Sequence, residues 1–249
     1  MKRRFTAFTL ALTTLPLAPA VAGPFPPAAG EPGSTAIAMD DPAIVAWATG
    51  YQDYIIGDPP PDATFQTPEK TLGPADGTSF DVVSLGDGGK ITYTFDLPIA
   101  NGDGYDFAVF DNSFADTWIE LAWVEVSNDG DQWYRFPNIS LTPEAIGSWG
   151  TIDPTDIDGF AGKYRAGYGT PFDLDDVGLS MARYVRIVDI IGDGSALDSE
   201  NNPIYDPYPQ FEGGVGFEVD AIGVMNVIPE PASVALLATG GLLLLRRRR

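Results

Sequence analysis

The chain has 249 residues, of which 44% are hydrophobic, and it contains neither cysteine nor histidine. This composition excludes a disulfide framework, nucleophilic sites with a histidine base, and the common zinc and copper sites. Seven basic and 34 acidic residues between Gly23 and Val227 give that stretch a net charge of −27. Such a surface repels phosphate backbones, so we expect no nucleic-acid partner. It favours divalent cations, and an acidic surface that serves only solubility is the alternative.

The N-terminus has the three parts of a secretory signal peptide. Lys2, Arg3 and Arg4 form a basic region, residues 5–17 are mostly apolar, and Ala20-Val21-Ala22 is a small-residue cleavage motif. We therefore assign residues 1–22 to a signal peptide, with cleavage before Gly23, and expect an exported protein. About 205 residues remain between this signal and the C-terminal segment described below, a length that fits one domain.

The stretch after the cleavage site is rich in proline and glycine. Residues 23–33 hold too many of these residues for regular structure, and we assign residues 23–40 to a linker before a domain at residues 41–227. The first expected element is a short helix at Ala43–Ala48. Beyond it, turn residues recur about every ten positions and no long run has a 3.6-residue period. This pattern predicts an all-β fold.

Several segments are predicted as strands. The clearest is Ile91–Leu97, in which apolar and polar side chains alternate. The Asp129-Gly130 step predicts a hairpin with a tight turn. Two long segments, residues 137–181 and 192–216, separate the later strands, and loops of that length usually bind a ligand or are ordered by one. The other predicted strands are Asp106–Asp111, Trp118–Ser127, Gln132–Phe136, Arg183–Ile191 and Phe217–Val224.

Two of these segments resemble motifs of discoidin and coagulation-factor type C domains. Residues 124–133, VEVSNDGDQW, are similar to the V-x-V-S-x-D-G-x-x-W hairpin of that family, and residues 182–187 are similar to its A-R-Y-V-R-I strand. The resemblance implies a jelly-roll β-sandwich of the galactose-binding-like type, with ligand loops at one end and a structural calcium ion. The chain lacks the cysteine pair of many discoidin domains and inserts about 45 residues between the motifs, so the ligand loops cannot be carried over.

Calcium is the cation that the carboxylates of this chain favour, and it would be held by residues distant in sequence. The candidate ligands lie at the end of one predicted strand and in the loop after the ARYVRI strand. They are Asp111 and Asn112, and Asp193, Asp198 and Asp206. Asp189 and Asp220 lie within apolar strands, where a carboxylate is either turned toward water or paired, and we expect Asp220 to face water.

Catalysis in this chain would depend on carboxylates. A glycosidase needs two carboxyl groups on either side of a cleft. Glu120 and Glu125 are the obvious glutamates, but residues five apart on one strand point to opposite faces. We therefore expect a non-catalytic protein, and a carboxylate-dependent polysaccharide hydrolase or lyase is the alternative.

Aromatic residues gather in the two long segments. Exposed rings there would stack on sugars, and the candidate ligand-binding residues are Trp149, Tyr164 and Tyr168. The alternative is that such rings are buried and pin the segments to the domain. Trp123 and Trp133 lie on predicted strands and are expected in the core or in cross-strand pairs.

The C-terminus joins a helix breaker, a short apolar run and a basic end. The breaker is Pro229, Glu230 and Pro231, the apolar run covers residues 232–245, and the basic end is Arg246, Arg247, Arg248 and Arg249. A helix of this length measures about 21 Å, less than the ~30 Å hydrocarbon core. The arginines can reach the headgroups and place that end in the cytoplasm. An ordinary single-span tail anchor is one interpretation.

The same order of parts resembles the PEP-CTERM sorting signal of Gram-negative bacteria. The resemblance covers residues 228–249 and implies a transmembrane helix that holds the chain in the inner membrane until an exosortase processes it. It also implies delivery to the cell surface or the extracellular matrix. We expect an exported, non-catalytic protein associated with exopolysaccharide, with calcium-dependent glycan binding as the candidate activity and a purely structural matrix role as a further alternative.

Overall fold

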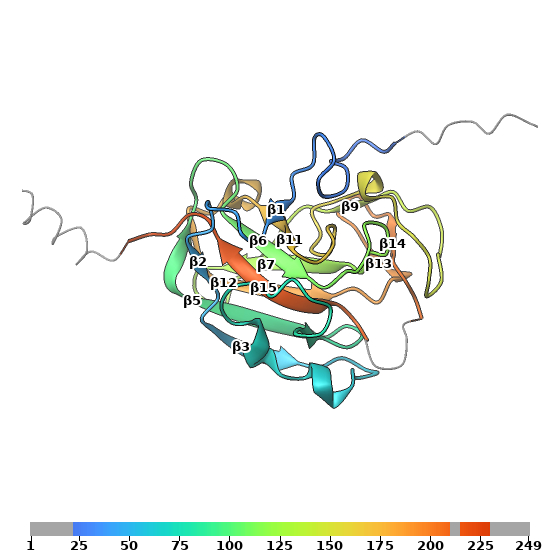
Figure 1. Ribbon diagram of the computed structural model, residues 1–249, viewed down its shortest axis with the longest axis horizontal. Helices are drawn as coiled ribbons and strands as arrows, with labels where there is room; N and C mark the ends of the chain where they lie inside the picture. The colour runs from blue at the N-terminus through green and yellow to red at the C-terminus, as the bar shows by residue number, and fades with distance from the viewer. Residues whose placement is uncertain (1–21, 210–214, 230–249) are drawn as a thin grey trace, which may run out of the picture.

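The computed structural model describes residues 22–209 and 215–229, and this part of the chain is an all-β domain of antiparallel strands (Figure 1). The all-β part of the predicted fold class is therefore confirmed. Residues 1–21 of the predicted signal peptide and the predicted helix at residues 232–245 lie outside the described residues. Within the described ranges, no helix is long and apolar enough to cross a membrane.

One main sheet has the strand order β1-β11-β6-β15-β2, and β4 also pairs with β15. Its centre is β6, where Val109 lies opposite Thr170 of β11 and Ile222 of β15. The predicted strands at residues 106–111 and 217–224 are thus confirmed, and the structure shows that they are direct neighbours. The strands are β1 Ile37–Ala38, β2 Ala46–Trp47, β4 Val83–Ser84, β6 Phe107–Asp111, β11 Tyr168–Phe172 and β15 Glu218–Val224.

The second main sheet has the strand order β3-β5-β12-β7-β8. The predicted strand at residues 91–97 is confirmed and extends further in both directions. Thr92 is buried together with Ile91 and Tyr93, so the polar face of this strand is covered at its start. The strands are β3 Gly50–Ile55, β5 Lys90–Ala100, β7 Ala122–Ser127, β8 Tyr134–Arg135 and β12 Met181–Asp189.

The two long segments between the later strands contain further structure. Each holds a small two-stranded antiparallel sheet: β9 with β10 in the first, and β13 with β14 in the second. The strands are β9 Ile139–Ser140, β10 Ile157–Asp158, β13 Asp193–Leu197 and β14 Pro203–Tyr205. Four 3-10 helices complete the described elements: η1 Ala63–Phe65, η2 Pro68–Thr71, η3 Pro154–Asp156 and η4 Leu174–Val177.

The two main sheets share one hydrophobic core. Phe107 and Val109 from the first sheet and Ile91, Val124 and Val126 from the second belong to the same cluster of buried side chains. Each such side chain stabilises the fold by roughly 1.5–3 kcal/mol when it is fully buried. A smaller cluster lies beneath the long segments and consists of Ile119, Leu121, Ile152, Ile157, Phe160, Ile190 and Ile204. Hydrophobic burial therefore takes the place of disulfides in holding this chain together.

The prediction of a helix at Ala43–Ala48 is wrong. Ala46–Trp47 forms β2 instead, with Trp47 opposite Gly223 of β15. So short a helix is unstable on its own, whereas the Trp47 ring packs against Phe110 with 5.5 Å between the ring centroids. Tertiary packing therefore overrides the local pattern.

Two further expectations differ from the structure in detail. The β7–β8 hairpin is present, but its loop covers residues 128–133 and only Gly130 has a positive φ, at 83°, so the connection is wider than a tight turn. Residues 23–40, expected as a linker, include β1, in which Ile37 pairs with Gly169 of β11. The N-terminal segment, blue in Figure 1, thus lies against the domain.

Candidate functional site

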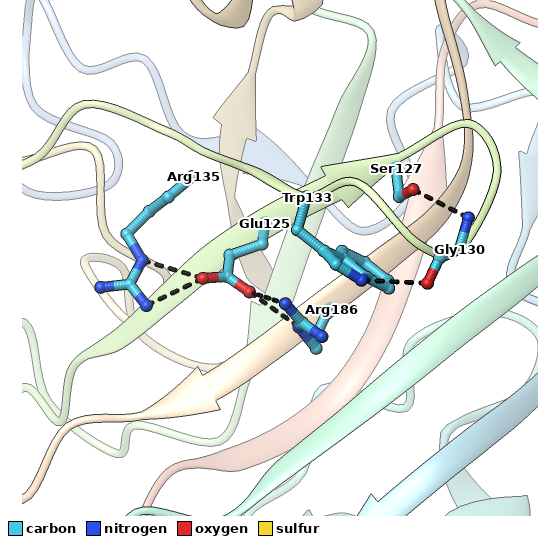
Figure 2. A network of polar contacts seen from close by, with 6 residues as sticks. All are labelled: Glu125, Ser127, Gly130, Trp133, Arg135 and Arg186. Atoms are coloured by element: carbon cyan, nitrogen blue, oxygen red, sulfur yellow. Dashed lines mark hydrogen bonds and ion pairs between the residues drawn. The ribbon is translucent and has the colours of Figure 1, made fainter.

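The two motifs that resemble discoidin domains are neighbours in the second main sheet. Glu125 of β7 lies opposite both Arg186 of β12 and Arg135 of β8. Figure 2 shows its carboxylate between the two guanidinium groups, where it accepts hydrogen bonds from Arg135 Nε at 3.0 Å and from Arg186 Nε at 2.7 Å. Charge-assisted bonds of this kind tie three strands together.

Each of these arginines also covers a tryptophan ring. The guanidinium carbon of Arg186 lies 3.7 Å from the centroid of Trp133, and that of Arg135 lies 4.0 Å from the centroid of Trp123. Trp133 Nε1 in turn donates to the carbonyl of Gly130 (Figure 2). Each tryptophan therefore packs against an arginine of another strand, Trp123 of β7 against Arg135 of β8 and Trp133, just before β8, against Arg186 of β12. Because the charged groups are paired with one another, we interpret this network as structural, although Trp123 Nε1 is buried without a hydrogen-bond partner among the described residues.

Among the predicted calcium ligands, burial raises the pKa of Asp206, and Asp193 lies close enough for its charge to raise that pKa further. No group of three or more acidic side chains within the described ranges is arranged to hold a metal ion. Asp198 is occupied as a hydrogen-bond acceptor, since it accepts from the N–H groups of Ser140 in β9 at 2.9 Å and of Asn202 in its own loop at 2.8 Å. The exposed Asp193 accepts from Ser195 N, and Asn112 Nδ2 donates to the carbonyl of Ser79.

Asp111 and Asp206 are the candidate ligands that retain an unpaired oxygen. Both are buried, and in each the Oδ1 atom has no hydrogen-bond partner in the described part of the chain. Burial raises the pKa of both carboxyls well above the ordinary value, and the charge of Glu218 beside Asp111 and of Asp189 beside Asp206 raises it further. These carboxyls are stable as neutral acids or beside a cation. Calcium binding therefore stays a prediction.

A buried pair of carboxyl groups, Glu120 and Glu218, was not predicted from the sequence. Glu120 lies just before β7 and is 6% exposed, and Glu218 begins β15 and is 8% exposed. Burial raises the pKa of Glu120 well above its usual range, with a further contribution from Glu218, and burial raises the pKa of Glu218 to about 7. Neither residue lines the pocket described below, so this pair is not part of that cavity.

The expectation that Asp220 faces water is wrong. Its side chain is buried, and its two oxygens accept hydrogen bonds from Asp76 N at 3.0 Å and Gly77 N at 2.9 Å. Asp189 is paired in the same way, with Gly88 N at 2.7 Å and Phe217 N at 2.6 Å. Both carboxylates therefore satisfy backbone N–H groups of neighbouring loops, which would otherwise be buried without an acceptor.

A pocket of about 300 Å³ opens beside β11, between the N-terminal segment and the loop around η4. Its base is aromatic, because Phe172 stacks on Phe107 with 5.3 Å between the ring centroids and packs against Phe136 at 4.9 Å. These rings belong to the main core and hold the base rigid. The lining residues are Pro26, Thr35, Tyr105, Phe136, Pro137, Asp158, Gly159, Lys163, Thr170, Pro171, Phe172 and Asp176.

The pocket wall contains a buried hydroxyl without a partner in the described ranges and an exposed aromatic ring. Thr170 is only 4% exposed, and its hydroxyl oxygen has no hydrogen-bond partner among the described residues. A buried hydroxyl without a partner is costly and is normally satisfied by water or a ligand. Tyr105 is 40% exposed and contributes a ring that a ligand can reach.

The charges of the pocket are unequal. Lys163 is buried, and its ammonium group donates to the carbonyl of Ile157 at 2.7 Å and lies 3.5 Å from Asp158 Oδ1. Burial lowers the pKa of Lys163, and Asp158 opposes that effect. Partial burial raises the pKa of Asp176, with further contributions from Asp173 and Asp158. Two acidic residues and one lysine therefore line the pocket, which disfavours an anionic ligand.

The three aromatic residues predicted to bind a ligand are elsewhere. Trp149 is 68% exposed, and Tyr168 is half-buried with the Arg165 guanidinium carbon 4.7 Å from its ring centroid. Tyr164 is buried, and its hydroxyl pairs with that of Thr35 at 2.8 Å, so it anchors the N-terminal segment and cannot stack on a ligand. The pocket aromatics Tyr105, Phe136 and Phe172 were missed as site residues. Only Phe172 carried a signal, since it lies in a long segment with other aromatic residues.

Comparison of the sequence with protein-family models finds no match, and no curated protein matches it. We therefore infer the function from the geometry of the pocket and from the sequence patterns at the two ends of the chain.

Proposed function

We propose that the protein is an exported, non-catalytic surface or matrix protein that binds a glycan of the exopolysaccharide layer in the pocket beside β11. The observation that carries this proposal is an exposed ring, Tyr105, in the same pocket as Thr170, whose hydroxyl has no partner in the described part of the chain. A sugar ring has apolar C–H faces and a hydroxyl rim. Aromatic surface with a few placed polar groups is the complementary arrangement.

The pocket favours neutral or amino-bearing sugars over uronic acids. A carboxylate on the sugar would be repelled by Asp158 and Asp176, and Lys163 is already engaged with Asp158 and a backbone carbonyl. An amino group would be attracted, and hydroxyl groups can donate to either carboxylate.

We also propose that the domain is a jelly roll of the galactose-binding-like type and that residues 228–249 are a PEP-CTERM signal processed by an exosortase. The first proposal is supported by the pairing of Glu125 with Arg186, which places the two family-like motifs side by side. The second rests on the sequence of the tail. Replacement of Glu230 by alanine should leave the full-length protein in the membrane fraction, and normal release of that variant would exclude the exosortase assignment.

The pocket also supports a second candidate, a carboxylate-dependent polysaccharide hydrolase. Asp158 of β10 and Asp176 of η4 come from different elements and line the same cavity. Asp158 is paired with a lysine, whereas the pKa of Asp176 is raised, first by burial. Unlike environments of two carboxyls are a feature of glycosidase acid–base pairs.

One experiment separates the two candidates. Purified protein is incubated with the native exopolysaccharide, and both retention on the polymer and the release of reducing ends are measured. A binding protein is retained without release, and Tyr105→Ala abolishes its retention. The control is Phe80→Ala, since Phe80 is 76% exposed and does not line the pocket. Release of reducing ends that Asp176→Asn abolishes would establish the hydrolase instead, and equal retention of both alanine variants would exclude the pocket.

A further inference from the structure

The segment from Gly23 to Thr35 is fastened to the domain along its length. Phe25 N donates to the carbonyl of Thr155 at 3.1 Å, and Arg165 Nη1 donates to the carbonyl of Ala29 at 2.9 Å. Ala29 is 5% exposed. The segment also supplies part of the pocket wall through Pro26 and Thr35. Its attachment therefore affects the shape of the candidate glycan site.

The first residue of this segment lies in a niche of oxygen atoms. Gly23 N donates to Thr155 Oγ1 at 2.6 Å. The Thr155 hydroxyl in turn donates a hydrogen bond to Asp153 Oδ1 at 2.7 Å. The Asp156 carboxylate is also adjacent, since a Cβ added at residue 23 would overlap both Asp156 Oδ1 and the Thr155 carbonyl oxygen. Only glycine fits at this position.

The niche offers more acceptors than a peptide N–H can use. A secondary amide supplies one donor, whereas a primary ammonium group supplies three donors and a positive charge. Thr155 Oγ1 accepts from the nitrogen, Asp153 Oδ1 accepts in turn from that hydroxyl, and Asp156 Oδ1 lies beside the α-carbon of residue 23. Burial raises the pKa of Asp156, and the charge of Asp153 raises it further, so the niche would be stabilised by a cation.

We infer that the niche formed by Asp153, Thr155 and Asp156 is the binding site for the α-ammonium group of Gly23, created when the signal peptide is removed. Hydrolysis of the Ala22–Gly23 bond adds water: the carboxylate leaves with the leader, and the amine on Gly23 takes up a proton. The inference rests on the export proposed above. Processing then fixes the N-terminal segment, and with it the pocket wall that contains Pro26 and Thr35.

The test compares two forms of the chain in detergent, one that begins at Gly23 and one that retains Ala22, both with the natural C-terminus. At pH 6.5 the Gly23 form should have a folding equilibrium constant roughly five- to tenfold larger, the range of a partly buried charge-assisted hydrogen bond. The advantage should be present below the ordinary α-amino pKa of ~7.7–8.0 and disappear as the pH rises through the raised folded pKa. Asp158, Lys163, Arg165 and Asp116 also lie along the segment, and they are identical in both forms.

The control variant is Asp156→Asn, which keeps the shape of the niche and removes its nearest charge. In this background, the two forms should differ by less than twofold. Equal stability of the two forms in the parent would overturn the inference. The N-terminus of the exported protein is determined separately by mass spectrometry. A start at another residue would overturn the processing step. It would not affect the glycan proposal, because the retention assay described above tests that proposal independently.

Discussion

At the scale of single residues, the buried carboxyls are the unusual feature of this protein. Burial raises the pKa of Asp189 and of Glu218 to about 7 in each case, although both belong to a residue type with an ordinary pKa near 4. A group whose pKa is raised by folding stabilises the protein below its unfolded pKa, and this contribution is lost as the pH rises through the folded pKa. Stability should therefore fall between about pH 4 and pH 7.

Glu218→Gln tests this account. Glutamine keeps the shape and the ability to hydrogen-bond with Glu120, but it cannot ionise. The variant should lose less stability than the parent between pH 5 and pH 8, by roughly 3 kcal/mol at most, the free energy of a pKa shift of this size. Denaturant unfolding at the two pH values measures the difference. Glu144→Gln is the exposed control, and equal pH dependence of all three proteins would contradict the account.

Tyr164 and Trp149 test the two alternatives for aromatic residues in the long segments. A ring is either buried and pins its segment to the domain, or exposed and able to stack on a sugar. Tyr164 is 1% exposed and paired with Thr35, so Tyr164→Ala should cost about 3–5 kcal/mol of unfolding free energy. Trp149 is 68% exposed, so Trp149→Ala should change stability by less than about 0.5 kcal/mol. Thermal or urea unfolding measures both changes. A similar loss of unfolding free energy in the two variants would show that exposure does not distinguish a structural ring from one available to a ligand.

At the scale of elements, the ion pairs of Glu125 with Arg135 and Arg186 join β7 to its neighbouring strands β8 and β12. Glu125→Ala leaves the guanidinium groups of Arg135 and Arg186 without their carboxylate, so it should destabilise the domain by roughly 2–4 kcal/mol. Arg135→Ala should cost less, because the Arg135 side chain is 41% exposed. Chemical unfolding measures both, and a smaller loss for Glu125→Ala than for Arg135→Ala would contradict this reading of the network.

The elements also show which features of the sequence were informative. Alternating residues and motif-like stretches predicted strands β5, β6, β7, β12 and β15, because these strands form the centres of the two sheets and have one face in the core. The short edge strand β2 was missed, since its conformation depends on packing of Trp47 against Phe110. The burial of Asp220 was missed for a related reason: its partners, the N–H groups at residues 76 and 77, are far away in sequence.

The candidate pocket could be predicted only in part. The sequence indicated that the long segment at residues 137–181 carries function, and this segment supplies Asp158 and Phe172. It could not indicate that Tyr105 and the N-terminal segment complete the same cavity, because that assembly depends on antiparallel pairing between strands distant in the chain.

At the scale of the whole molecule, the excess of negative charge makes cations an important variable. If calcium binds the folded domain alone, it should stabilise it by about 2.7 kcal/mol at one hundred times the dissociation constant. Millimolar calcium should therefore raise the melting temperature beyond the effect of sodium at equal ionic strength. Asp206→Asn should reduce the calcium-specific part, because Asp206 is buried and its Oδ1 has no partner within residues 22–209 and 215–229. Equal shifts from the two salts would mean screening alone.

The most direct test of the central claim is a calorimetric titration of oligosaccharides from the native exopolysaccharide into the parent protein and into Tyr105→Ala. We predict saturable binding to the parent at one site, stronger for neutral or amino-bearing fragments than for uronic acid fragments, and loss of that binding in the variant, with its melting temperature nearly unchanged because Tyr105 is 40% exposed. Absence of binding to the parent, or binding that the variant retains in full, would contradict the assignment of this pocket as a glycan site.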